Sequence, residues 1–283
     1  MNLILASRPG DVDVPNEDYA AAHNNTVVVL DGLTARTESG CIHGVPWYVA
    51  SLATGILRDA ALGPAEALRR AIEKTADSHR DTCDLHHGGT PTAAVAIVQE
   101  TPLTLRYLVL GDTTIVLDTQ RGIEVVTDSR VHYTAPDERA AADALPIGSA
   151  EKEQALIRIK HAELAARNVA GGYWAANTDP DAVSHSVVGE VPLAEVQAVA
   201  LLTDGAARLV EDFDAVTWEE LLDTLHAAGP DRVLERVRQM EDSDPAGARW
   251  PRNKKSDDAT AAYLVPAGVR STTASNSAGS VHG

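Results

Sequence analysis

Four apolar segments of this sequence carry a carboxylate at one end. The segments "VVVLDG", "LRYLVLGD", "AVALLTDG" and "SDDATAAYLV" place Asp31, Asp112, Asp204 and Asp257 at the ends of predicted strands. A single Asp-Gly pair is well explained as a turn, because glycine accepts a positive φ and aspartate hydrogen-bonds to its own backbone. Four such carboxylates in one chain instead indicate that acidic side chains meet at one end of a β-sheet.

The rest of the chain alternates between short strand-like segments and longer helical ones. Apolar spacing predicts strands at residues 3–6, 26–30, 92–98, 103–110, 113–117 and 123–127, and in "AVALLTDG" and "ATAAYLV". It predicts helices at residues 47–57, 64–81, 151–168, 217–228 and 231–241. Strands in runs followed by helices in runs favour the α+β class over a parallel βαβ fold.

The length and composition fit one large domain. A chain of 283 residues with 44% hydrophobic content can bury a sizeable core without division into two domains. The segment 268–283 is rich in Ser, Gly and Thr, which is typical of a disordered tail. We therefore expect a folded domain over residues 1–267 and a disordered tail over residues 268–283.

The charge of the chain excludes some partners. It has 24 Lys and Arg against 41 Asp and Glu, a net charge of -17. Nucleic acids and anionic membranes are bound by basic patches, so neither is expected as a partner. No apolar stretch approaches the roughly 18 residues of a membrane span, and the N-terminal segment lacks the features of a secretion signal. A cytoplasmic location is expected.

Cysteine and histidine give weaker signals. The two cysteines, Cys41 and Cys83, are too few for a disulfide framework and lack the paired spacing that a structural zinc site requires. Cys41 and His43 stand close enough in sequence to form a metal-binding pair, but ordinary buried or loop residues are the better interpretation. His86 and His87, beside two glycines, are interpreted in the same way as part of a polar loop.

The carboxylates themselves favour a hard divalent cation. The segment "PNEDY" adds Glu17 and Asp18 to the predicted cluster. Without compensation such a cluster repels itself and raises its own pKa values. Mg²⁺ or Mn²⁺ resolves the conflict, because both prefer oxygen ligands in octahedral geometry. Zinc is disfavoured, since no histidine stands in these stretches.

These segments, in this order, resemble the metal-dependent type 2C protein phosphatases, the PPM family of Ser/Thr phosphatases. "SRPGDVDVPNEDY" is similar to the family's first motif, which ends in Asn-Glu-Asp, and "VVVLDG" to its metal-bridging strand. "GGTPTAAVAIV", "LVLGDTTIVL", "ALPIGSA", "ALLTDGAARLV" and "SDDATAAYLV" resemble the motifs that follow. The match runs over about residues 3–265. Each motif alone is weak, but their common order makes the resemblance specific.

The resemblance implies a metal centre. Asp31 would bridge two Mn²⁺ or Mg²⁺ ions, and Gly32 would offer its carbonyl group. Glu17 would serve the second ion directly or through water. Asp204 and Asp257 would hold the first ion, so that Asp31, Asp204 and Asp257 would be the residues on which catalysis depends.

The resemblance also implies the fold and the reaction. Asp112 matches the position that, with Asp204, holds a third and weaker ion in bacterial members. The family fold is a four-layer α-β-β-α sandwich, two packed antiparallel sheets flanked by helices. Two cations lower the pKa of a bridging water enough to supply a hydroxide for in-line attack on phosphorus. The expected substrate is a phosphoserine or phosphothreonine protein.

The chain departs from the family pattern at positions that serve two functions, phosphate binding and protonation of the leaving group. Asp13 stands where the family usually has an arginine that grips the phosphate. Leu33 stands where many members have a histidine credited with protonating the leaving group, and Thr34 and Ala35 replace two glycines. Phosphate binding and leaving-group protonation therefore need other residues.

Several residues are candidates for these roles. Arg8 or Arg36 could replace the cation, and His43 the acid. The family carries a flap before the Ser-Asp-Gly strand, so Tyr173 and Trp174 are candidates for substrate contact, although a core position explains them equally well.

Three interpretations of function are compatible with the sequence. The first is an active phosphatase for phosphoserine or phosphothreonine proteins, expected to be monomeric. The second is a non-catalytic member of the fold that binds a phosphoprotein or another partner. The third is a hydrolase for a small phosphorylated metabolite. Asp179, which precedes Pro180, is interpreted outside all three as the N-cap of a helix.

Overall fold

Two antiparallel sheets of five strands each form the centre of the molecule. The computed structural model describes residues 1–267, so the predicted tail lies outside the described residues. One sheet has the order β1-β10-β9-β6-β7 and the other the order β2-β3-β4-β5-β8. The strands are β1 (Asn2–Arg8), β2 (Tyr19–His23), β3 (Thr26–Gly32), β4 (Ala93–Glu100), β5 (Thr104–Leu110), β6 (Thr114–Thr119), β7 (Gly122–Val126), β8 (Val187–Pro192), β9 (Val196–Leu202) and β10 (Ala259–Val265).

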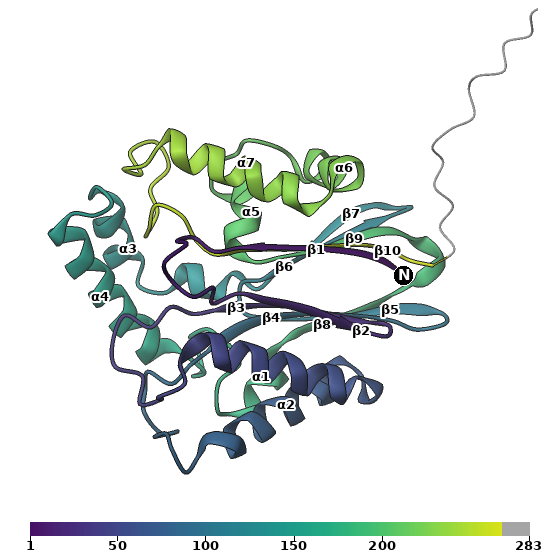
Figure 1. Cartoon of the computed structure of the whole chain (residues 1–283), viewed down its shortest axis with the longest axis horizontal. Coiled ribbons are helices and arrows are strands. Elements are labelled where there is room, and N and C mark those ends of the chain that lie inside the picture. Colours follow the sequence, from purple (N-terminus) through teal and green to yellow (C-terminus); the bar gives the residue numbers. More distant parts are fainter. Residues whose placement is uncertain (268–283) are drawn as a thin grey trace, which may run out of the picture.

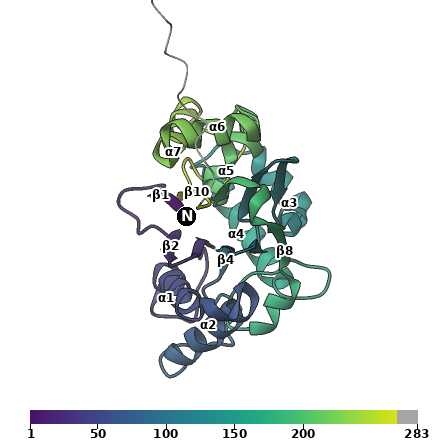
Figure 2. The ribbon, with the colours of Figure 1, turned by 90° about the vertical axis from the view of Figure 1, so that its right-hand side faces the viewer.

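Helices cover the outer face of each sheet. The helices are α1 (Gly44–Arg58), α2 (Pro64–His79), α3 (Pro136–Asp143), α4 (Ala150–Ala166), α5 (Asp204–Glu211), α6 (Trp218–Ala228) and α7 (Pro230–Ser243). α1 and α2 pack on the sheet that holds β3, whereas α5 and α7 pack on the sheet that holds β10. Figures 1 and 2 show α6 and α7 on one outer side and α1 and α2 on the other. The predicted α+β class and four-layer α-β-β-α sandwich are confirmed.

Strand β3 shows why its sequence is apolar on both faces. Val27 and Val29 lie in the core between the sheets, and Val28 and Leu30 pack in the core beneath α1 and α2. Because side chains alternate along a strand, Asp31 continues the face of Val27 and Val29. The strand therefore delivers this carboxylate to the end of the space between the two sheets.

The predicted elements are found with small shifts at their ends, but two strands and two α-helices were not predicted. The two missed strands, β2 and β8, form the two edges of one sheet and are short and partly exposed. The two missed helices, α3 and α5, have eight residues each. Short edge strands and two-turn helices carry too few residues for a clear apolar period.

α3 and α4 lie together at one end of the sandwich, beyond the end of β3 (Figure 1). Four short 3₁₀ helices connect other elements: Ala60–Leu62, Ser129–Tyr133, Pro180–His185 and Leu193–Glu195. None of the helices in residues 1–267 combines the length and the apolar character that crossing a membrane requires.

Candidate metal centre

The predicted carboxylates converge in one cleft at the end of the sandwich. Strand ends and a loop bring together Asp31, Asp112, Asp204 and Asp257, with Gly32 beside them. Helix α4 and two loops also line this cleft. They contribute Leu33, Thr34, Arg36, Leu156, Ile159, Lys160, Glu163, Asn253 and Lys254. The four aspartates thus lie in one cleft, and their role as metal ligands stays a prediction.

The Asp-Gly pairs are not all turns. Asp31 and Gly32 are the last two residues of β3 and pair with Ala94 and Ala93 of β4. A Cβ on Gly32 would lie 2.4 Å from the carbonyl oxygen of Glu17, so glycine is needed there for close packing rather than for a turn. At Gly111, by contrast, φ is +84°, and the turn explanation holds.

Asp204 begins helix α5 directly after β9. Its backbone N–H donates to Asp31 Oδ2 at 3.2 Å, which fixes the first turn of α5 against the end of β3. The N-terminus of a helix favours a negative group, so this contact stabilises the Asp31 carboxylate. Asp112 follows β5, and its carboxylate lies 3.8 Å from Nε2 of His132.

Asp257 is held by two cations of the protein. Lys254 Nζ lies 2.5 Å from its Oδ1, and the guanidinium of Arg208 lies 3.3 Å from its Oδ2. Arg208 is buried and also pairs with Glu241 at 2.7 Å. The last predicted ligand therefore stands in a network that already carries positive charge.

The segment before β2 is tied to the same centre. Asp258, next to Asp257, accepts hydrogen bonds from the backbone N–H groups of Gly10 at 2.8 Å and Glu17 at 2.7 Å. Glu17 accepts a hydrogen bond from Thr34 Oγ1 at 2.6 Å but, unlike Thr34, does not line the cleft. Asp18 is buried and accepts from Thr203 Oγ1 at 2.8 Å.

The ligand set implied by the resemblance did not include Asp18. Its charge raises the pKa of Asp31, so it lies within the same electrostatic cluster. The sequence signal was present, because Asp18 follows Glu17 in the "NED" motif.

Burial and mutual repulsion shift the pKa values of these carboxylic acids. Burial, followed by the charges of Asp204 and Asp18, raises the pKa of Asp31 well above its ordinary value. Burial and the charge of Asp257 raise the pKa of Asp204 to about 7. Asp257 is the exception: although burial opposes it, Lys254 and Arg208 hold its pKa below the ordinary value. A free carboxylate pair at Asp31 and Asp204 is therefore unfavourable without a further positive charge.

The donor set fits a hard divalent cation. Asp31, Asp112, Asp204 and Asp257 offer oxygen atoms only, from four separate segments, in one open cleft. Among residues 1–267, neither histidine nor cysteine lines the cleft. Oxygen donors with room for water are the environment that Mg²⁺ and Mn²⁺ prefer.

The candidates for phosphate binding separate clearly. Arg36 lines the cleft, whereas Arg8 pairs with Asp231 on α7 and does not line it. Asp13 is exposed on the loop before β2 and lies outside the lining. Lys160, buried on α4, adds a cation that the sequence analysis did not identify.

Other predicted roles are resolved by position. His43 does not line the cleft, so it is misplaced for the predicted role of acid. Tyr173 is buried in a small core with Val131, and Trp174 stacks on His185 at 3.4 Å between ring centroids. Helix α4 lines the cleft that holds the carboxylates, whereas neither of these two aromatic residues does.

The two structural interpretations are confirmed. Asp179 caps the 3₁₀ helix at Pro180–His185 by accepting from the N–H of Asp181. His86 and His87 lie in the loop between α2 and β4.

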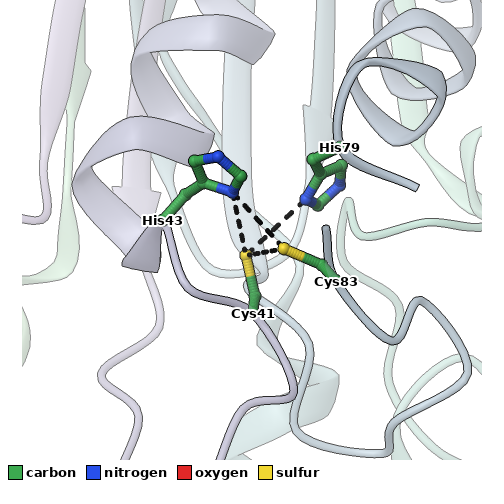
Figure 3. Close-up of side chains that lie close together, drawn as sticks. All are labelled: Cys41, His43, His79 and Cys83. Atoms are coloured by element: carbon green, nitrogen blue, oxygen red, sulfur yellow. Dashed lines mark hydrogen bonds between the residues drawn. The ribbon is translucent and has the colours of Figure 1, made fainter. Parts of the chain in front are cut away.

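Sequence analysis set aside Cys41 and His43 as a metal-binding pair and did not connect them with His79 and Cys83. Cys41, His43, His79 and Cys83 come together beside the first turn of α1 and the end of α2, as Figure 3 shows. We name these four residues the Cys/His cluster. Each half of the cluster pairs one cysteine with one histidine, so the search for two closely spaced cysteines did not find it.

Comparison with known proteins identifies the family. Residues 11–240 match the family model of protein phosphatase 2C. The match spans most of the chain, and the chain therefore belongs to this family, whose members are metal-dependent Ser/Thr protein phosphatases. None of the curated proteins gives a significant match.

Solved structures support the same fold. The chain is similar to the Ser/Thr phosphatase Stp1 of Staphylococcus aureus, with 12% identity, a TM-score of 0.56, and coverage of 94% of this chain and 95% of that one. PppA of Pseudomonas aeruginosa is 16% identical, with a TM-score of 0.55 and coverage of 93% and 96%. The catalytic domain of the phosphatase PstP, solved with two manganese ions, is 16% identical, with a TM-score of 0.53 and coverage of 93% and 96%.

Proposed function

We propose that this protein is an active Mn²⁺- or Mg²⁺-dependent phosphatase that removes phosphate from phosphoserine and phosphothreonine residues of proteins. One observation carries the proposal: four aspartates from separate elements meet in one cleft, where burial and repulsion raise the pKa values of Asp31 and Asp204. A protein that had lost its metals would gain stability by losing such a cluster.

The ligands follow from the geometry and from the family. Asp31 would bridge two ions with Gly32 supplying its carbonyl oxygen, and Asp204 and Asp257 would hold one of them. Glu17 would serve the other directly or through water. The two manganese ions bound by the structurally similar PstP domain support this number.

A third, weaker ion is proposed between Asp112 and Asp204. When bound, the ions would neutralise the carboxylates and lower the pKa of a coordinated water molecule. Nε2 of His132 lies 3.8 Å from the Asp112 carboxylate.

Two cations that line the cleft would bind the phosphate. Arg36 and Lys160 both line it, and they would supply the positive charge that Asp13 does not provide. A guanidinium suits a phosphate because it donates two parallel hydrogen bonds. Arg36 is free to turn toward substrate, since its partner Glu153 is exposed and lies 3.4 Å away.

The other two interpretations differ from this one in testable ways. A non-catalytic binding protein would bind phosphopeptide without releasing phosphate. A metabolite hydrolase would prefer small phosphate esters over phosphopeptides. The open cleft, bounded by α4 and two loops, favours a peptide.

The first experiment is phosphate release from a generic aryl phosphate with Mn²⁺ or Mg²⁺, with a chelator as control. The second compares a phosphothreonine peptide with a panel of phosphorylated metabolites. Metal-dependent turnover with preference for the peptide is expected. No turnover with either metal would support the binding-protein interpretation.

A cytoplasmic location and a monomeric state stay predictions. Cell fractionation and the mass of the purified chain in solution test them directly.

A further inference from the structure

The Cys/His cluster brings four soft or borderline ligand atoms to one point, shown in Figure 3. One ligand atom from each residue lies within 4.8 Å of every other. Both cysteines are free thiols, and their sulfur atoms lie 3.3 Å apart. That separation exceeds the covalent S–S bond of about 2.0 Å, so the two sulfur atoms are neighbours and not a disulfide.

Most distances between the ligand atoms are those of a tetrahedral zinc site. Cys83 Sγ lies 3.3 Å from His43 Nδ1, and Cys41 Sγ lies 3.7 Å from the same nitrogen. Cys41 Sγ lies 3.6 Å from His79 Nδ1. Zinc bonds of about 2.3 Å to sulfur and about 2.0–2.1 Å to nitrogen place tetrahedral ligand atoms about 3.3–3.8 Å apart. With the pair of sulfur atoms, four of the six ligand pairs have these spacings, and the other two pairs lie within 4.8 Å.

Helices and an aromatic side chain hold the cluster in place. His43 immediately precedes α1, and His79 is the last residue of α2. Trp47 stacks on His43 with ring centroids 4.3 Å apart and lies 5.0 Å from His79. Because the two imidazoles are fixed by packing, little ordering is needed to bind an ion.

Burial and the donors distinguish this cluster from the carboxylate cleft. His79 is 2% exposed, and its Nδ1 lies within hydrogen-bond distance of Cys41 Sγ. Its Nε2 has no hydrogen-bond partner among the described residues. Sulfur and imidazole ligands select zinc, whereas Mn²⁺ and Mg²⁺ prefer oxygen. None of the four residues lines the cleft.

We propose that the Cys/His cluster binds one structural zinc ion. Four protein ligands leave no open position, which is typical of a structural and not a catalytic zinc site. The proposal does not depend on the phosphatase activity.

The zinc ion would fasten the loop that follows the metal-bridging strand. Residues 33–43 leave β3 at Asp31-Gly32 and reach α1 through Cys41 and His43. The two halves of the cluster are already joined beside the cysteines, because the N–H of Asp84 donates to the carbonyl of Gly40 at 2.9 Å. Zinc would add a covalent link between this loop and the end of α2.

The same loop carries two residues of the cleft. Thr34 donates to Glu17, and Arg36 lines the phosphate side. Loss of zinc would therefore loosen Thr34 and Arg36 without touching the aspartates. The expected result is a higher KM for phosphopeptide and a lower melting temperature.

The test uses the full chain, purified without added metal from cells grown with zinc. Elemental analysis should find one zinc per chain, and dialysis against a chelator that strips Mn²⁺ should leave it in place. Replacement by Co²⁺ should give the thiolate-to-cobalt charge-transfer bands and the intense visible bands of tetrahedral geometry. This spectrum is a readout that does not depend on activity.

Variants locate the ion. Cys41→Ser and Cys83→Ser should each lose the zinc and the cobalt spectrum, whereas Asp31→Asn should keep both. His86→Ala is the matched control, because His86 is exposed in the loop after Cys83 and lies outside the cluster. It should retain one zinc per chain.

Two outcomes would overturn the proposal. One is wild-type protein with far less than one zinc per chain and no tetrahedral cobalt spectrum, whether its cysteines are free or joined in a disulfide. The other is zinc that persists at one per chain in both cysteine variants, which would place the ion elsewhere. The wild-type measurements decide the matter even if a cysteine variant does not fold.

Discussion

The ammonium group of Lys254 lies 2.5 Å from Asp257 Oδ1, inside the cleft that the aspartates form. Lys254 also donates to Thr34 Oγ1 at 3.3 Å. The ammonium group of Lys254 thus occupies one carboxylate oxygen of Asp257, a proposed metal ligand. A metal ion that binds Asp257 must compete with Lys254 for that carboxylate.

Lys254→Met should therefore strengthen Mn²⁺ binding. The expected gain is about fivefold in affinity, or roughly 1 kcal/mol, the upper end for a partly exposed ion pair. Calorimetric titration of metal-free protein with Mn²⁺ measures it. Lys255→Met is the control, because Lys255 pairs with the exposed Asp242 at 2.7 Å. Equal affinities in the parent and in Lys254→Met would show that Lys254 does not compete for the ligand.

Arg36→Gln should weaken phosphopeptide binding. A hydrogen bond to a charged group contributes about 1.5–3 kcal/mol, so KM should rise about tenfold or more. The change should affect KM more than kcat if Arg36 holds the phosphate equally in the ground and transition states. Arg8→Gln provides the matched control, because Arg8 pairs with Asp231 away from the cleft. An unchanged KM in Arg36→Gln would remove Arg36 from the phosphate site.

The stability of metal-free protein should fall as pH rises from about 4 to above 7. The folded-state pKa of Asp204 is about 7 and that of Asp31 is also raised, whereas both are near 3.8 when unfolded. The folded protein then holds more protons than the unfolded one in this window, so raising the pH destabilises it. Thermal melts across this range measure the effect, and Asp204→Asn should flatten it.

Mn²⁺ should reverse that trend. It binds deprotonated carboxylates, so the gain in melting temperature on adding Mn²⁺ should grow as pH rises through 7. At a hundredfold excess over its dissociation constant the ion adds about 2.7 kcal/mol, or roughly 5–10 °C. No gain with saturating Mn²⁺ or Mg²⁺ at pH 8 would mean that the carboxylate cluster is not a metal site.

Phosphopeptides flanked by Lys or Arg should be better substrates than acidic ones. The net charge of -17 repels acidic peptides over roughly a Debye length, about 8 Å at physiological salt. The preference should appear in kcat/KM and shrink as salt is added. Equal kcat/KM values for a basic and an acidic phosphopeptide at low salt would remove this steering effect.

The fold and the acidic half of the site could be predicted from sequence because both depend on local patterns. Strand β3 is apolar on both faces, and its last two residues place Asp31 and Gly32 at the strand end whatever the partner strands are. The motif order then specified Asp112, Asp204 and Asp257 as well.

The cationic half could not be predicted, because it depends on distant packing. Lys160 comes from α4, more than a hundred residues after Arg36, and helix periodicity gives no sign that its charged side faces a cleft. Lys254 lies in a loop without any pattern. The Cys/His cluster was not predicted for the same reason, because its two halves lie at the ends of different helices.

The proposed metal centre depends most on Asp31, and one comparison of variants tests that dependence most directly. Phosphate release from a phosphothreonine peptide is measured against Mn²⁺ concentration for the parent, Asp31→Asn and Asp179→Asn. Asp31→Asn removes the charge that two ions would share, several kcal/mol of transition-state stabilisation, so activity should fall by about two orders of magnitude or more while the fold survives. Asp179→Asn should match the parent, because asparagine caps a helix about as well as aspartate. Equal losses in the two variants, or full Mn²⁺-dependent activity in Asp31→Asn, would contradict the assignment of the metal centre.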